Sequence, residues 1–228
     1  MRLPIRRLLV PCVSILLSCC ANRVADAQGF TFEAMSGSAL NVPTPLTVSQ
    51  NGYPDIRFSA HYDTKPFGPF YPYYSWRASF WNRQHDQAWE ITQVHHRLFL
   101  ANNPPEIQFF AIHFGYNFYM FGHAWKRNGF IYHVDGGILI CSPDNTVRGQ
   151  QLDTQGTGIL DSGYTLAGGG GEFAVSRQFA LSRRVFIVAD GALLAGRARV
   201  PVANGSAAVP NVGFHGKAGV GFNFGRSG

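Results

Sequence analysis

The chain has 228 residues, a formal net charge of +6, 46% hydrophobic residues and only 14% charged residues. Its mean hydropathy of −0.04 argues against a bundle of transmembrane helices, because each such helix needs about 20 consecutive apolar residues. A transmembrane β-barrel is not excluded, since alternating apolar and polar positions average to a neutral hydropathy. The length suits one domain.

The first residues predict a secretory signal peptide over 1–27. Positive charges lead into an apolar stretch of about ten residues, too short to span a bilayer, and Ala25-Asp26-Ala27 is a small-residue cleavage motif. Leu16-Leu17-Ser18-Cys19 is a weaker, lipoprotein-like alternative. Cleavage near Ala27 would remove four arginines, so the precursor pI of 9.4 does not indicate nucleic-acid binding. Cys141 would then be the one cysteine left, without a partner for an internal disulfide.

The segment 28–53 follows as a predicted periplasmic lead-in. Phe30 to Ala34 alternates briefly and could form one short strand, but Pro43 and Pro45 then interrupt the pattern. Proline is poorly tolerated inside a central strand. We therefore place the start of the folded domain at residue 54 and its end at 228.

From Pro54 onward, apolar residues recur at every second position, which is the period of a β-strand. The connections after the second, fourth and sixth predicted strands are short and the others mostly longer, as in outer-membrane barrels. The predicted fold is all-β: a closed antiparallel up-and-down transmembrane β-barrel of about eight strands, with ten as the alternative. The predicted strands cover roughly residues 55–65, 73–81, 88–100, 107–120, 129–141, 164–179, 185–200 and 211–225.

The strand at 107–120 has the longest apolar row, at every second residue from Phe110 to Met120. We predict that this row faces lipid and that His113, Gly115 and Asn117 face the lumen. In the strand at 88–100 the apolar positions change parity, which predicts a β-bulge near Gln93. The sequence leaves open which of His95 and His96 faces the lumen.

Two stretches resemble known proteins. Gly219-Val220-Gly221-Phe222-Asn223-Phe224 resembles the aromatic closing strand of small bacterial outer-membrane proteins. The stretch from Pro54 to Asn117, with its Lys65-Pro66-Phe67, His95-His96-Arg97 and His113-Phe114-Gly115-Tyr116-Asn117 motifs, looks like a group of uncharacterised proteins of this class. The resemblance implies the barrel fold and a bacterial outer-membrane location only. For a protein of this kind we expect a monomer that contacts outer-membrane lipids or lipopolysaccharide, is inserted by the barrel-assembly machinery and has no nucleic-acid partner. The resemblance implies no activity.

The lumen-facing positions are predicted to be polar. An eight-stranded barrel has room inside only for side chains, and buried charges must be paired. The preferred interpretation is therefore a plugged lumen and a structural or surface-interaction role, with a narrow channel disfavoured. The predicted network comprises Arg57, His61, Asp63, Arg77, Glu90, Asn117, His133, Asp190, His215 and Lys217.

The alternative function is an enzyme that modifies lipid A or phospholipid near the extracellular end. His95, His113 and Asp135 are predicted to converge on one patch of the barrel wall, where a histidine paired with a carboxylate could act as a general base. A nucleophile could come from Ser59, Ser75 or Ser79, but none lies in a nucleophile motif.

No cofactor and no metal are predicted, and ligation by His95, His113 and His133 is a third, disfavoured interpretation. Aromatic residues at 67, 70, 71 and 73 suit an interfacial girdle. As an alternative they could contact lipopolysaccharide, with Lys65, Arg97 and Arg148 meeting its phosphates.

Overall fold

The computed structural model describes residues 29–65, 72–154, 158–159 and 162–224, and its regular elements there are β-strands. The predicted signal peptide and the aromatic positions 67, 70 and 71 lie outside these residues. In the described part, no helix has the length and apolar character needed to cross a membrane. The strands are β1 (Gly29–Val42), β2 (Thr44–Gln50), β3 (Ile56–Ala60), β4 (Tyr62–Asp63), β5 (Tyr74–Trp81), β6 (Gln87–Leu100), β7 (Ile107–Arg127), β8 (Phe130–Cys141), β9 (Asp144–Val147), β10 (Gln150–Gln151), β11 (Thr165–Ala180), β12 (Val185–Val202) and β13 (Gly205–Asn223).

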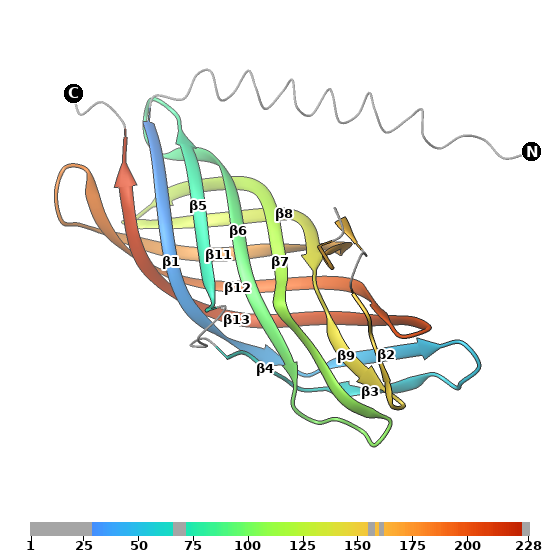
Figure 1. Ribbon diagram of the computed structural model, residues 1–228. Helices are drawn as coiled ribbons and strands as arrows, with labels where there is room; N and C mark the ends of the chain where they lie inside the picture. Colours follow the sequence, from blue (N-terminus) through green and yellow to red (C-terminus); the bar gives the residue numbers. More distant parts are fainter. Residues whose placement is uncertain (1–28, 66–71, 155–157, 160–161, 225–228) are drawn as a thin grey trace, which may run out of the picture.

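Eight of these strands form a closed wall. Antiparallel ladders run in the order β1, β5, β6, β7, β8, β11, β12 and β13, and β13 pairs back onto β1. Figure 1 shows β1 and β13 side by side where the ring closes. The predicted closed antiparallel barrel is confirmed.

The short connections share one end of the barrel. Only residues 82–86, 128–129 and 181–184 separate β5 from β6, β7 from β8, and β11 from β12. Asn128 (φ 52°) and Gly129 (φ 79°) form a two-residue turn with both residues in the left-handed region, the geometry that matches the twist of a hairpin. The first residues of β1 and the last of β13 lie at this same end (Figure 1).

The predicted lead-in is wrong, because β1 is a full wall strand. Thr31 pairs with both Ser79 of β5 and Asn223 of β13. Pro43 falls between β1 and β2, where no ladder bond is needed, so the proline marks the end of a strand rather than its absence. The predicted first strand at 55–65 instead supplies β3 and β4, which lie outside the ring of eight.

Beyond the ring, several strands continue as an extension at the end with the longer connections (Figure 1). Here β2 pairs with β13 and β3, β4 pairs with the end of β6, and β9 pairs with the start of β7. The extension encloses a large apolar core. Its buried residues include Leu46, Val48, Leu98, Ile107, Phe110, Ile112, Val147, Val200 and Val209.

This core reverses the predicted faces of β7. Phe110, Ile112, Tyr116, Phe118 and Met120 are 0–3% exposed and point inward. The outward row of β7 is the opposite one and includes Tyr119 and Phe121. The predicted lipid-facing row therefore packs the interior, because the extension and the adjoining part of the barrel have an apolar inside.

The bulge predicted near Gln93 is likewise misplaced. In β6, Glu90, Thr92, Val94, His96 and Leu98 are all buried and of one parity. The register shift lies between His96 and Leu98, opposite residues 113–115 of β7. His96 thus faces the interior, and His95 faces outward.

The outer face of the wall carries large exposed apolar side chains. Such a belt around a closed barrel is what a hydrocarbon environment requires. It comprises Ile91, Tyr119, Phe121, Val134, Ile138, Phe173, Ile187, Leu193, Phe214, Val220 and Phe222.

Candidate functional site in the barrel interior

A cluster of buried charges lies inside the wall and centres on Arg77 of β5. The guanidinium is fully buried. It contacts Glu172 at 2.9 Å, Asp190 at 3.0 Å and Glu33 at 3.3 Å, and its Nε lies 3.8 Å from Glu90. The four carboxylates come from four different strands, so the side chain of Arg77 links β1, β6, β11 and β12 across the lumen.

Lys217 of β13 extends this cluster. Its Nζ lies 3.0 Å from a carboxylate oxygen of Glu172 and 3.0 Å from one of Asp190. Both carboxylates are therefore shared between the two cations. Charge-assisted bonds of this kind are stronger than neutral ones, and sharing satisfies several lone pairs at once.

His133 of β8 joins the cluster through both ring nitrogens. Nδ1 lies 2.8 Å from Glu90 and Nε2 lies 2.8 Å from the hydroxyl of Ser176. Asp135, two residues along the same strand, makes one long bond of 3.5 Å with Thr92. In total, five buried carboxyl groups face two permanent cations, so this part of the lumen is acid-rich.

Apolar groups close the cluster on both sides. Toward the short turns, Trp81, Ala88, Ala124 and Ile131 pack together, and the indole of Trp81 donates to Thr31 at 3.0 Å. Toward the extension lies the apolar core that includes Phe118.

Much of the predicted lumen network is gathered here. The structure brings together Arg77, Glu90, His133, Asp190 and Lys217. The sequence reasoning missed Glu33 and Glu172. Glu33 lies in the segment interpreted as a lead-in, although it alternates there with Phe32 and Ala34. Glu172 directly follows four glycines, which have no side chains to indicate which face of the strand points into the lumen.

Four predicted members of the network are misplaced. Arg57, His61 and Asp63 are exposed residues of the extension, and Arg57 pairs with Asp55 at 2.7 Å. They are not lumenal because their segment is not a wall strand. Asn117 lies in the outward row of β7 and bonds His95 Nδ1 at 2.7 Å.

The structure does not bring His95, His113 and Asp135 together. His95 stacks on Tyr74 outside the wall, with ring centroids 4.6 Å apart, whereas Asp135 lies inside. His113 is in the extension, 3.9 Å from Asp144. Partial burial lowers the pKa of His113, and the nearby Asp144 charge opposes this shift. Within the described residues, no three His, Cys, Asp or Glu side chains form a metal-binding group.

A second polar group lies inside the barrel near the start of the extension. His96 of β6 and His215 of β13 approach edge to face, with ring centroids 4.7 Å apart. Tyr73 completes the group through a 2.8 Å bond between its hydroxyl and His215 Nδ1. Of these three residues, the sequence predicted only His215 as lumenal.

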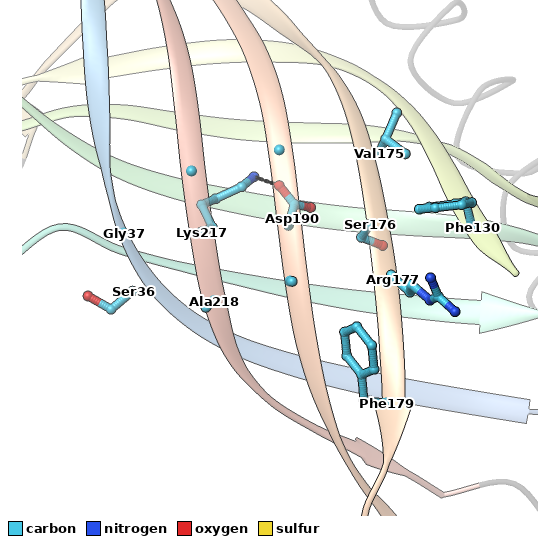
Figure 2. A pocket seen from close by; sticks show the side chains of 13 residues that line it. Ser36, Gly37, Phe130, Val175, Ser176, Arg177, Phe179, Asp190, Lys217 and Ala218 are labelled. Carbon is cyan, nitrogen blue, oxygen red and sulfur yellow. Dashed lines mark ion pairs between the residues drawn. The ribbon is translucent and has the colours of Figure 1, made fainter.

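A recess of about 620 Å³ is formed by residues of β1, β8, β11, β12 and β13. Figure 2 shows the ion pair between Lys217 and Asp190 on neighbouring strands at this recess. Arg177 lies over the ring of Phe130, with 5.4 Å from its Cζ to the ring centroid. Two glycines of the recess lie beside open space, since a Cβ added at Gly191 or Gly216 would meet nothing within 4 Å.

The ring of eight strands, apolar outside and charged inside, defines a small transmembrane β-barrel.

No protein-family profile matches the chain, and no curated protein matches its sequence. Among solved structures, it is similar to Ail, the attachment invasion locus protein of Yersinia pestis, with 13% identity over 86% of this chain and 99% of that one and a TM-score of 0.41. It is also similar to the outer membrane protein AlkL, with 9% identity over 89% of this chain and 93% of AlkL, and a TM-score of 0.47. The similarity to Neisserial surface protein A has 10% identity over 86% of this chain and 97% of that protein, and a TM-score of 0.33. The closed ring of strand ladders, with its apolar outer face and charged inner face, defines the barrel independently of these similarities.

Proposed function

We propose that the chain is a bacterial outer-membrane β-barrel with a closed interior and a structural or surface-interaction role. The observation that carries this proposal is the packing of the lumen: Arg77, Glu90 and Lys217 are 0–4% exposed. A barrel interior filled by a cluster of buried charged side chains between two apolar layers should leave no path for water or ions. The membrane location is supported by the apolar outer belt.

The test of a closed interior is conductance. Purified barrel in a planar bilayer should show no steady ion current at neutral pH. Folding is checked in parallel by heat-modifiable migration in a detergent gel. A reproducible ohmic current from folded protein would overturn the proposal.

The surface-interaction role is supported by a cationic patch on the extension. Lys65 Nζ lies 4.5 Å and Arg97 Cζ lies 4.9 Å from the ring centroid of Phe99. Two cations on one aromatic ring suit the phosphates of lipopolysaccharide. Arg148, also considered from the sequence, is instead held by Gln50 and the carbonyl of Pro54, so its role is structural.

This patch is tested by binding of purified lipopolysaccharide. The Lys65→Ala and Arg97→Ala double variant should bind it more weakly, and more so at low salt. Arg57→Ala, which removes one exposed positive charge elsewhere on the extension, is the matched control. Equal binding by wild type and double variant would remove the patch from the proposal, while the conductance result would stand independently.

The lipid-modifying alternative finds no favourable geometry, since its proposed residues lie on opposite sides of the wall. Mass spectrometry of lipid A from cells with and without the protein decides this question directly.

A further inference from the structure

Two histidines meet inside the barrel from strands that are not neighbours. His96 on β6 is 0% exposed and His215 on β13 is 2% exposed. Strands β5 and β1 separate them in the ring. Their rings nevertheless lie 4.7 Å apart, at an interplanar angle of 73°.

The hydrogen bonds around His96 accommodate a proton on its Nε2 atom. The Thr64 hydroxyl donates to the carbonyl of Arg97 at 3.3 Å. Its oxygen is then an acceptor, 2.9 Å from the Asn41 side-chain nitrogen and 2.8 Å from His96 Nε2. In this arrangement His96 Nε2–H donates a hydrogen bond to the Thr64 oxygen. The lone pair is left on Nδ1, which is buried without a partner among the described residues.

His215 has the complementary arrangement. Nδ1 lies 2.8 Å from the hydroxyl oxygen of Tyr73, and Nε2 is buried without a partner in the described part of the chain. In proteins, a histidine that binds a metal through one nitrogen usually donates the other N–H to an oxygen nearby. Thr64 and Tyr73 supply such oxygens to the two rings.

The distance between the rings suits one shared ion. A metal–nitrogen bond is about 2.0–2.1 Å long, which places the ion about 3.2 Å from each ring centroid. Two rings on one ion at a ligand angle of about 90–110° then have centroids about 4.5–5.2 Å apart. The observed separation of 4.7 Å lies in this range.

An amide oxygen borders the same space. A Cβ added at Gly213 would lie 3.0 Å from His215 Nε2 and 3.3 Å from Asn41 Oδ1, so the glycine leaves room between these two atoms. Asn211 donates to Asn41 Oδ1 at 3.0 Å and so orients this oxygen. The side chains thus offer two imidazole nitrogens and one amide oxygen, all uncharged.

The charges nearby are balanced. Lys217 lies two residues from His215, but its ammonium is paired with Glu172 and Asp190. The donor set contains no carboxylate, which disfavours Ca²⁺ and Mg²⁺, whereas imidazole suits Zn²⁺, Cu²⁺ and Ni²⁺.

We propose that His96 Nδ1 and His215 Nε2, with the amide oxygen of Asn41, form a binding site for one divalent transition-metal ion inside the barrel. Thr64 and Tyr73 orient the two rings. The site is independent of the proposed closed lumen, because it lies on the extension side of the Arg77 cluster.

The experiment uses the full mature barrel, folded in detergent and carrying no histidine tag. Calorimetric titration with Zn²⁺ should show one ion per barrel, and Mg²⁺ should show none. With Cu²⁺, electron paramagnetic resonance should show hyperfine coupling to two imidazole nitrogens. His96→Gln and His215→Gln should each weaken Zn²⁺ binding at least tenfold. Tyr73→Phe should weaken it about 10–100-fold as an orienting partner.

His61→Gln, which removes an exposed histidine of the extension, is the matched control and should bind as wild type. Gly213→Ala places a methyl group in the proposed space and should also block binding. Heat-modifiable gel migration confirms that each variant is folded. Absence of Zn²⁺ binding by the folded wild type, or unchanged binding by the folded His96→Gln and His215→Gln variants, would overturn the proposal.

Discussion

Arg77 holds the interior together because, among the described residues, it is the one buried cation that contacts carboxylates on four strands. Without it, Glu33 would keep its bond from Gln178 and Glu90 its contact with His133, and neither would face a permanent cation in the described part of the chain. Glu172 and Asp190 would share only Lys217. Buried charges without partners are far more costly than the net stability that the intact pair provides.

Arg77→Met is therefore expected to lower the free energy of unfolding by about 3–5 kcal/mol. The measurement is urea unfolding of the barrel in lipid vesicles, followed by tryptophan fluorescence. Arg57→Met is the matched control, since its pair with Asp55 is exposed and worth about 0–1 kcal/mol. If the two variants lose similar stability, the cluster is not the main electrostatic tie across the lumen.

Phe118 shows why particular glycines are needed in the wall. An added Cβ at Gly170 would lie 2.7 Å from its ring, and one at Gly196 would lie 3.0 Å from it. Gly196→Val should cost about 1–3 kcal/mol by overpacking. Gly191→Ala is the control, because a Cβ there meets nothing within 4 Å. Unfolding curves that coincide for the two variants would contradict this packing.

At the scale of the element, the sequence located the strands better than it showed which face of each strand points into the barrel. Alternation placed β5, β6, β7, β8, β11 and β12 near their observed positions. It could not say that the apolar row of β7 packs an interior core, because lipid and a protein core select the same side chains. For the same reason, Val94 and Leu98 suggested a bulge that β6 does not have at Gln93. The sequence predicted part of the charged site. Arg77 and Lys217 alternate with apolar neighbours and so could be assigned to the lumen, whereas Glu172 follows a run of glycines that gives no alternation.

The orientation of β5 gives a direct test of inside and outside. Trp76 lies in its outward row, and Trp81 is buried in its inward row. In vesicles of brominated lipid, a variant that keeps only Trp76 should be strongly quenched, and one that keeps only Trp81 should be weakly quenched. The other tryptophans are replaced by Phe. Equal quenching would contradict the orientation of β5 with Trp76 facing lipid and Trp81 facing the lumen.

The whole molecule is a stack of three interior layers within one continuous wall. An apolar cap around Trp81 lies nearest the short turns, the charged cluster follows, and the apolar core of the extension lies beyond. The apolar core begins within the part of the wall that carries the outer apolar belt, where Phe118 and Met120 alternate with Tyr119 and Phe121. It continues into the extension, so the barrel and the extension share one core.

Because the ring of eight strands closes without β2 and β3, it should survive their removal. The ends of this segment are already adjacent, since the Asn41 side chain donates to the carbonyl of Tyr62 at 3.0 Å. Replacing residues 44–60 with a short Gly-Ser linker should leave heat-modifiable gel migration intact. It should lower stability, because Leu46, Val48 and Ile56 leave the apolar core.

The contrasting deletion removes residues 29–36, the part of β1 that pairs with β5. This segment carries Glu33 and closes the ring between β5 and β13. An unpaired strand edge cannot persist in hydrocarbon, so this variant should lose the heat-modifiable band entirely. A folded band from the shorter deletion, with loss of the band from the 44–60 replacement, would reverse the assignment of which segment builds the wall.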